Sequence, residues 1–109
     1  MYIYNVTINI DETSHPEWLV WIESHVEKTL ATGCFSSAKM TQVLVEEEMG
    51  GFTYSIQFTA PSREDLDEFY KTYADILNND ANQKFGSKML TFKTELKLIK
   101  EFYSTVSNN

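Results

Sequence analysis

The sequence has little cysteine, arginine or proline, and it has no long apolar run. Its single cysteine, Cys34, cannot form an internal disulfide, which fits a reducing compartment. No segment approaches the ~20 consecutive apolar residues that a membrane-spanning helix needs. The amino terminus also lacks the basic and apolar segments of a secretory signal. We therefore expect a soluble, cytoplasmic protein.

Basic side chains are scarce as well: 9 Lys and Arg stand against 16 Asp and Glu, which gives a formal net charge of −7. Phosphate groups are recognised by clustered basic side chains, and by arginine forks in particular. Here Arg63 is the one arginine, and the lysines are scattered apart from Lys93, Lys97 and Lys100 near the end. We expect neither nucleic acid nor an anionic membrane as a partner.

The sequence does contain enough apolar and aromatic side chains for a packed core, 42% and 14% of its 109 residues. A chain of this length has room for one domain, which needs no metal or disulfide to fold. We find no linker or low-complexity block within it. Residues 1–103 are assigned to a single domain and residues 104–109 to a frayed tail.

Four segments alternate with the period of two that is typical of half-buried strands. The inward face of the second segment stays open, because Met40 and Leu44 compete with Val43 and Val45. Gly50-Gly51 predicts a hairpin turn after that segment. The four expected strands are residues 2–10, 35–46, 52–60 and 90–98.

Two further segments repeat at the spacing of an amphipathic helix. The first begins at Ser14, whose hydroxyl is expected to form a capping box with Glu17, and it closes at Gly33. The second begins with Ser62 as its cap. It has a weak point at residues 78–80, Asn-Asn-Asp, where we expect it to bend or break.

The order strand-helix-strand-strand-helix-strand, with right-handed crossovers, predicts an α+β fold of the ferredoxin-like βαββαβ type. In this sandwich a four-stranded antiparallel sheet carries two helices on one face, and the first and third strands are central. Those two strands are the ones with apolar inner faces, so the element order and the burial pattern agree.

The face of the two central strands that points away from the helices is polar yet carries no charge. A solvated sheet face usually recruits Lys and Glu, as the last strand does with Lys93 and Glu95. An uncharged polar face fits a second sheet that covers it, so we expect a homodimer; β-propensity alone, which favours Thr, is the alternative. The expected dimer face consists of Asn5, Thr7, Asn9, Thr53, Ser55, Gln57 and Thr59.

Several short motifs resemble an uncharacterised bacterial family of short proteins, a domain of unknown function. The resemblance runs from Met1 to about Ile99 and implies a ferredoxin-like domain of the dimeric α+β barrel kind, in which two sheets close on each other. It implies no activity. The motifs are Tyr2-Ile-Tyr-Asn-Val-Thr7, His15, Trp18-Leu-Val-Trp21, His25, Leu30-Ala-Thr-Gly33, Thr53-Tyr-Ser-Ile-Gln57 and Phe85-Gly86.

The sequence departs from this family's pattern at two places. Gln42 stands where members often have a basic residue, and Val26-Glu27 stands where they have Ile-Pro. Both departures argue against an anion site near the second strand, so the resemblance supports the fold and the pairing and adds no chemistry.

His25 is the best candidate for chemistry. It falls on the apolar side of the first helix beside Trp21, so we expect it to lie over the sheet and to face Tyr4 or Tyr54. An imidazole beside a phenol can do acid–base work or bind a small ligand in a pocket between helix and sheet. The alternative is a structural histidine, hydrogen-bonded to a tyrosine hydroxyl or a backbone carbonyl.

The other reactive side chains predict no site. His15 is expected to be exposed at the helix start, and two histidines ten residues apart without an acidic partner make a poor metal site. The run Glu46-Glu47-Glu48 is interpreted as a solvated hairpin rim, since successive strand residues point to opposite faces. Cys34 has no base beside it in sequence, and is interpreted as a buried or idle thiol. We therefore expect no metal and no cofactor.

Two functions remain open. The first is a small, non-enzymatic homodimeric domain that binds a small molecule in the helix–sheet pocket or a protein on its surface. The second is a cofactor-independent oxygenase or isomerase of the dimeric α+β barrel type, acting on a small apolar substrate. In that enzyme His25 is the acid or base, and Tyr4 or Tyr54 is the hydrogen-bond donor.

Overall fold

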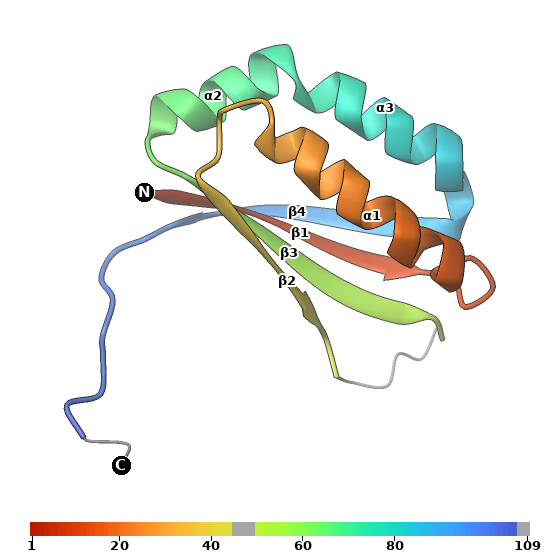
Figure 1. Ribbon diagram of the computed structural model, residues 1–109, viewed down its shortest axis with the longest axis horizontal. Helices are drawn as coiled ribbons and strands as arrows, with labels where there is room; N and C mark the ends of the chain where they lie inside the picture. Colours follow the sequence, from red (N-terminus) through yellow and green to blue (C-terminus); the bar gives the residue numbers. More distant parts are fainter. Residues whose placement is uncertain (45–49, 107–109) are drawn as a thin grey trace.

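The computed structural model describes residues 1–44 and 50–106. All helices lie on one face of a single antiparallel sheet with the strand order β2-β3-β1-β4, as Figure 1 shows. This is the predicted ferredoxin-like arrangement, and β1 and β3 are its central strands. The elements are β1 (Tyr2–Ile10), α1 (His15–Leu30), β2 (Ser37–Gln42), β3 (Phe52–Ala60), α2 (Arg63–Thr72), α3 (Ala74–Phe85), the short 3₁₀ helix η1 (Gly86–Lys88) and β4 (Met89–Lys97).

The core lies between the helices and the inner face of the sheet. In the β1–β3 ladder Tyr4 is opposite Phe58 and Ile8 is opposite Tyr54, so the apolar sets of both strands share this face. The helices add large side chains that are almost fully buried, Trp18 among them. Burying each such side chain stabilises the fold by about 1.5–3 kcal/mol. Helices this short are marginal in water on their own, so this packing is what stabilises them.

Both helices begin where the sequence predicted, but only the second forms its predicted cap bond. The Ser62 hydroxyl accepts a hydrogen bond from the Asp65 backbone N–H at 3.1 Å, in the extended backbone that a cap requires. Ser14 instead has helical backbone angles and makes no side-chain cap bond. The predicted capping box is therefore wrong: the turn Asp11–Ser14 gives Ser14 helical backbone angles, whereas a side-chain cap requires extended ones.

The helical region after Ser62 is divided, but not where the sequence predicted. Residues 78–80 are regular helix within α3, and the break between α2 and α3 lies at Tyr73. The φ of Tyr73 is −120°, well away from helical values. Three weak helix formers were thus overridden by packing, since Leu77, directly before them, is buried in the core.

Strand β2 is shorter than predicted, and its register settles which side faces the helices. Met40 is opposite Ile56 and Ala38 is opposite Phe58, so the even-numbered residues are on the helical side. Leu44 is described but lies beyond the strand. The predicted extension over residues 45–46, Val45 included, lies outside the described residues.

Strand β4 presents the opposite faces to those predicted. Glu95 is opposite Tyr4 and Lys93 is opposite Val6, so the charged residues of β4 face the helices. The apolar residues Leu90, Phe92 and Leu96 point away from them and are 44%, 64% and 41% exposed. The expectation of a solvated, charged outer face on this strand is wrong: its outer face is an apolar strip.

The last described segment leaves the sheet. The Leu98 backbone N–H still donates to the carbonyl oxygen of Met1 at 3.0 Å, and beyond it the chain runs away from the globule (Figure 1). Residues 99–106 contain no helix or strand. Residues 107–109 of the predicted frayed tail lie outside the described residues.

Among the described residues, no helix combines the length and the apolar character required to cross a membrane.

The start of β3 is fixed by a close approach of two backbones, which yields a stability prediction. At Gly51 the φ is +77° and a Cβ would lie 2.5 Å from the Ile10 carbonyl oxygen, whereas at Gly50 the φ is +76° and the space is open. Gly51→Ala should lower the free energy of unfolding by about 2–4 kcal/mol, and Gly50→Ala by about 1 kcal/mol. Urea denaturation measures both, and equal losses would contradict the close approach.

Candidate functional site

A cavity of about 100 Å³ lies between α1, α3 and the inner face of the sheet. Its walls are mostly apolar, and polar side chains, including Asn78 and Asn82 of α3, reach it from four elements. Three of these polar side chains can exchange a proton. Tyr4 contributes from β1, His25 from α1 and Lys93 from β4. An apolar pocket with a few convergent polar groups is the usual form of a small-molecule site.

His25 forms the wall of the cavity on the α1 side. Its ring stacks on Trp21 at a centroid distance of 4.4 Å, and Trp21 in turn meets the edge of Phe85 at 5.1 Å. Burial lowers the pKa of His25, although Asp80 acts in the opposite direction. The imidazole is therefore neutral near pH 7, and it can accept a proton or a hydrogen bond.

Tyr4 forms the floor of the cavity and is 5% exposed. Its ring lies among aromatic neighbours, 5.4 Å from Phe69 and 5.7 Å from Tyr70 between centroids. Burial, and the charge of Glu95, raise the pKa of Tyr4 to about 12. The phenol therefore stays protonated at any physiological pH, and it is available as a hydrogen-bond donor.

Lys93 lies at the open rim of the cavity. The sequence analysis did not place it in the site, because the faces of β4 were interpreted the wrong way round. Its apolar surroundings lower its pKa, while the carboxylate of Asp75 acts against this shift. The register of β4 against β1 holds the necessary signal, but that register depends on the turn through η1 and not on the pattern of β4 itself.

Tyr54 does not belong to this cavity. Its hydroxyl lies 2.6 Å from Nε2 of His15, and the His15 ring stacks on Phe52 at 3.9 Å. The structure therefore pairs Tyr54 with the other histidine. His15 is half-buried rather than exposed, because the first turn of α1 lies directly over the end of β3.

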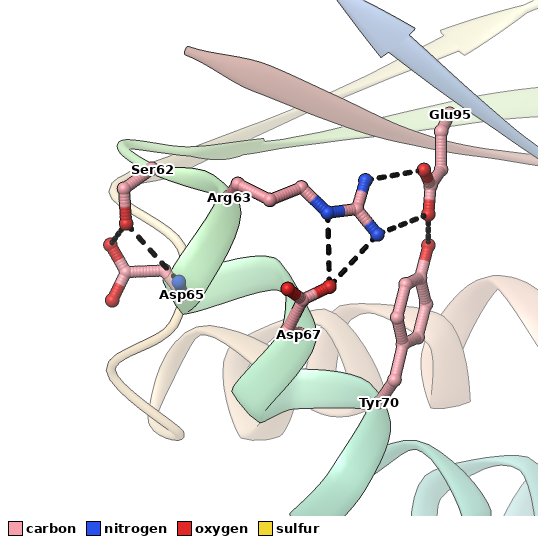
Figure 2. Close-up of polar contacts among 6 residues, drawn as sticks. All are labelled: Ser62, Arg63, Asp65, Asp67, Tyr70 and Glu95. Atoms are coloured by element: carbon pink, nitrogen blue, oxygen red, sulfur yellow. Dashed lines mark hydrogen bonds and ion pairs between the residues drawn. The ribbon is translucent and has the colours of Figure 1, made fainter.

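A polar cluster joins the charged face of β4 to α2. Figure 2 shows the Arg63 guanidinium between two carboxylates, with the Tyr70 hydroxyl on one of them. Arg63 Nη1 lies 2.6 Å from Glu95 Oε1, and the Tyr70 hydroxyl donates to Glu95 Oε2 at 2.5 Å. Because Tyr70 also contacts Tyr4, this cluster positions the floor of the cavity.

The predicted dimer face forms a connected polar surface on the opposite side of the sheet. The Ser55 hydroxyl donates to Asn5 Oδ1 at 2.7 Å, and Asn9 Nδ2 donates to the Thr53 hydroxyl at 3.1 Å. Thr53 itself is only 8% exposed, so within one chain it is already covered. Polar groups that are satisfied within the sheet cost little to cover with a second surface.

Other reactive groups lie apart from the cavity. Cys34 is buried and forms no disulfide. No group of three or more His, Cys, Asp or Glu side chains in the part of the chain that the structure describes is close enough to hold a metal ion. The run Glu46-Glu47-Glu48 lies outside that part.

Comparison with known proteins identifies the family. The sequence profile of a domain of unknown function, DUF4286, matches residues 1–99, and the chain belongs to this family. Among curated proteins the sequence finds no match.

Solved structures share the fold at low sequence identity. A dimeric ferredoxin-like protein from an uncultured marine organism superposes with a TM-score of 0.71 at 9% identity, over 93% of this chain and 97% of that one. An EthD family protein from Bacillus halodurans gives 0.60 at 16%, over 89% and 100%. A proposed antibiotic biosynthesis monooxygenase from Deinococcus radiodurans gives 0.61 at 10%, over 97% and 100%. At these identities the likeness shows the fold alone.

The cluster in Figure 2 predicts a pH-dependent contribution to stability. The Arg63 guanidinium and the Tyr70 hydroxyl lower the pKa of Glu95. A lowered pKa stabilises the fold above the unfolded value of about 4.3, and the contribution disappears as pH falls through the folded value. Glu95→Gln should therefore lower the melting temperature at pH 7, and this difference from the wild type should shrink below about pH 4.

The matched control is Glu23→Gln, which removes the same charge from an exposed position on α1. Thermal unfolding followed by circular dichroism at several pH values measures all three proteins. If Glu95→Gln lowers the melting temperature by the same amount at pH 3 and at pH 7, the ion pair is not the cause of the loss.

Proposed function

We propose that this member of the family is a homodimeric small-molecule-binding domain, whose helix–sheet cavity holds a ring-sized, largely apolar molecule with one acidic group. The observation that carries the proposal is the composition of the cavity. Mostly apolar walls, which also include two threonines and two asparagines, surround a protonated phenol, a neutral imidazole and one ammonium group. Tyr4, His25 and Lys93 contribute these three groups.

The volume of the cavity limits its ligand. At about 100 Å³ it is somewhat smaller than the ~150 Å³ apolar cavity that takes up benzene in another protein, so one ring is the largest group that fits inside. Larger parts of a ligand would have to extend past the rim, where Lys93 is exposed.

The charges at the cavity favour an acidic group on the ligand. Among the described residues that line it, Lys93 is the one with a permanent charge at neutral pH. Burial lowers the pKa of Lys93, but the nearby carboxylate of Asp75 raises it and so favours the charged form. The chain as a whole has a net charge of −7, so an anion finds few other places to bind.

A cofactor-independent oxygenase or isomerase is the second candidate. The shared cavity of His25 and Tyr4 favours it, since a neutral imidazole can remove a proton while a phenol stabilises the resulting oxyanion. Tyr54 has no part in this version, because it is bonded to His15. One structural neighbour is described as a proposed antibiotic biosynthesis monooxygenase, which is a likeness of fold only.

The homodimer is supported by the outer face of the sheet. Its centre is polar and satisfied within the chain, and its β4 margin is an apolar strip of Leu90, Phe92 and Leu96. An apolar margin beside uncharged central strands is typical of a surface that another protein surface covers, and Lys39 lies on the opposite, β2 margin. One neighbour of the same fold is described as dimeric. The buried free thiol of Cys34 supports a cytoplasmic location.

Binding to the cavity is tested with two single-ring probes, benzoate and benzyl alcohol, followed through the backbone amide signals in NMR. Both should shift amides of α1, α3 and β4 around the cavity, and benzoate should bind with a Kd of about 1 mM or tighter. Lys93→Gln should weaken benzoate binding about three- to tenfold and leave benzyl alcohol unchanged.

The matched control is Lys97→Gln, which removes an equal charge from the same face of β4, away from the cavity. If neither ring shifts the cavity amides at tens of millimolar, the binding proposal fails. If both probes are recovered unchanged after incubation with the protein in aerated buffer, the result supports a binding domain. A new chemical product that is absent when His25 is substituted supports the enzyme.

The homodimer is tested by sedimentation equilibrium. The wild type should be a dimer at micromolar concentration, and Phe92→Lys should weaken it about a hundredfold or more, since two-fold symmetry places two new charges in one interface. Val20→Lys makes the same change at a 79% exposed position on α1 and should leave the dimer intact. A wild type that remains monomeric at 100 µM, far above the expected ~1 µM Kd, contradicts the proposal.

A further inference from the structure

We infer that residues 99–106 form an arm that packs on a second copy of this chain, against the outer side of its sheet. This inference rests on the homodimer proposed above and adds a second contact to it. All but the first residue of this segment lie beyond the family match, which ends at residue 99.

The arm has the composition of an interface, and within one chain its apolar side chains stay exposed. Four of its apolar side chains are 74–83% exposed, more than the apolar strip of β4 itself. Large apolar side chains gathered in one extended segment are unfavourable in water and typically lie against another surface. These side chains are Ile99, Phe102, Tyr103 and Val106.

The direction of the arm identifies the surface it can reach. In Figure 1 the helices lie on one side of the sheet, and the arm runs toward the opposite side, away from its own core. That opposite side is where the proposed second sheet lies. The arm begins directly after β4, so it is continuous with the strand that carries the apolar strip.

The length of the arm is sufficient for this contact. Eight residues in extended conformation span about 26 Å. Four strands spaced about 4.8 Å apart make a sheet about 19 Å wide, so an arm from one chain can cross the whole sheet of another.

The area of the sheet gives an independent argument for a second contact. Three strands have nine residues and are about 30 Å long, and β2 has six, so the outer face measures roughly 500 Å² in flat projection. Stable interfaces bury about 800 Å² on each partner, and the centre of this face is polar. An apolar arm from each chain supplies area and apolar contact that the sheets alone lack.

The charges fit as well. The described arm carries one positive and one negative side chain, Lys100 and Glu101, and the central strands of the outer face carry none. The arm and the central strands therefore bring no like charges together, and Lys39 on the β2 margin lies on the same face as the Glu101 of an incoming arm. A partner recognised through charge would need a basic surface to match the net −7 of the chain, and the arm offers no acidic cluster for it.

The first test is sedimentation equilibrium of the full-length Phe102→Ser/Tyr103→Ser variant. We expect the dimer Kd to rise at least about tenfold, since each dimer loses four aromatic side chains from its interface. The matched control is Ile76→Ser, which removes an apolar side chain that is 64% exposed on α3, on the helical side. It should leave the Kd unchanged.

The second test determines which chain the arm touches. A nitroxide label on Tyr103→Cys, in a chain that also carries Cys34→Ala, is mixed with an equimolar amount of isotope-labelled wild type. Broadening of the outer-face amides of the isotope-labelled chain shows contact with a second copy.

The outcomes separate the two proposals. An unchanged Kd in the arm variant, or broadening only when label and isotope are on the same chain, overturns the arm contact and leaves the sheet dimer standing. A wild type that is monomeric at 100 µM, far above the expected ~1 µM Kd, overturns both. If Phe92→Lys weakens the dimer and the arm variant leaves its Kd unchanged, the interface consists of the sheets alone.

Discussion

The register of β4 against β1 is the constraint on which the rest of this structure depends. It sets Lys93 opposite Val6 and Glu95 opposite Tyr4, and so turns the charged residues of an edge strand toward the helices. Because side chains alternate along a strand, a shift by one residue would exchange its two faces. The arrangement is tolerated because the helical side is open at this edge: Glu95 is bonded to Arg63, and Lys93 reaches the rim of the cavity.

The cavity follows from the same constraint. An edge strand with large apolar residues on its inner face would fill the space beneath α3, as Phe58 and Ile56 fill it further along the sheet. Thr91 and Lys93 leave that space partly open. The aromatic side chains around Tyr4 then hold a phenol whose pKa is raised, beside a histidine whose pKa is lowered, so both groups are neutral at pH 7. A mostly apolar site whose polar groups are neutral except for one cation fits the proposed ligand, a largely apolar molecule with one acidic group.

The sequence predicts the fold well, since the period of two in β1 and β3 and the cap at Ser62 are local signals that the tertiary structure reinforces. It predicts the site only in part. The α1 periodicity placed His25 and Trp21 correctly on the inner side, but whether Tyr4 or Tyr54 lies nearby depends on the angle at which α1 crosses the sheet. The faces of β4 were not predictable from its alternation, because a strand with one charged and one apolar face looks the same whichever way it is turned. Burial favours the apolar face inward in a monomer, and this strand does the reverse.

That reversal links the two halves of the proposed function. Phe92 and Lys93 are neighbours in sequence and point to opposite faces of one strand, so the surface for a second chain and the rim of the cavity share a backbone. On one side β4 pairs with β1, while its other side is an unpaired edge. Its position therefore depends on the Arg63 cluster above it and on whatever covers the apolar strip below it. A second sheet against that strip would fix the position of β4 relative to the helices. It would thereby also fix the distance between Lys93 and Tyr4 at the floor of the cavity. On this argument the dimer is a condition for a well-defined ligand site, rather than a separate property of the fold.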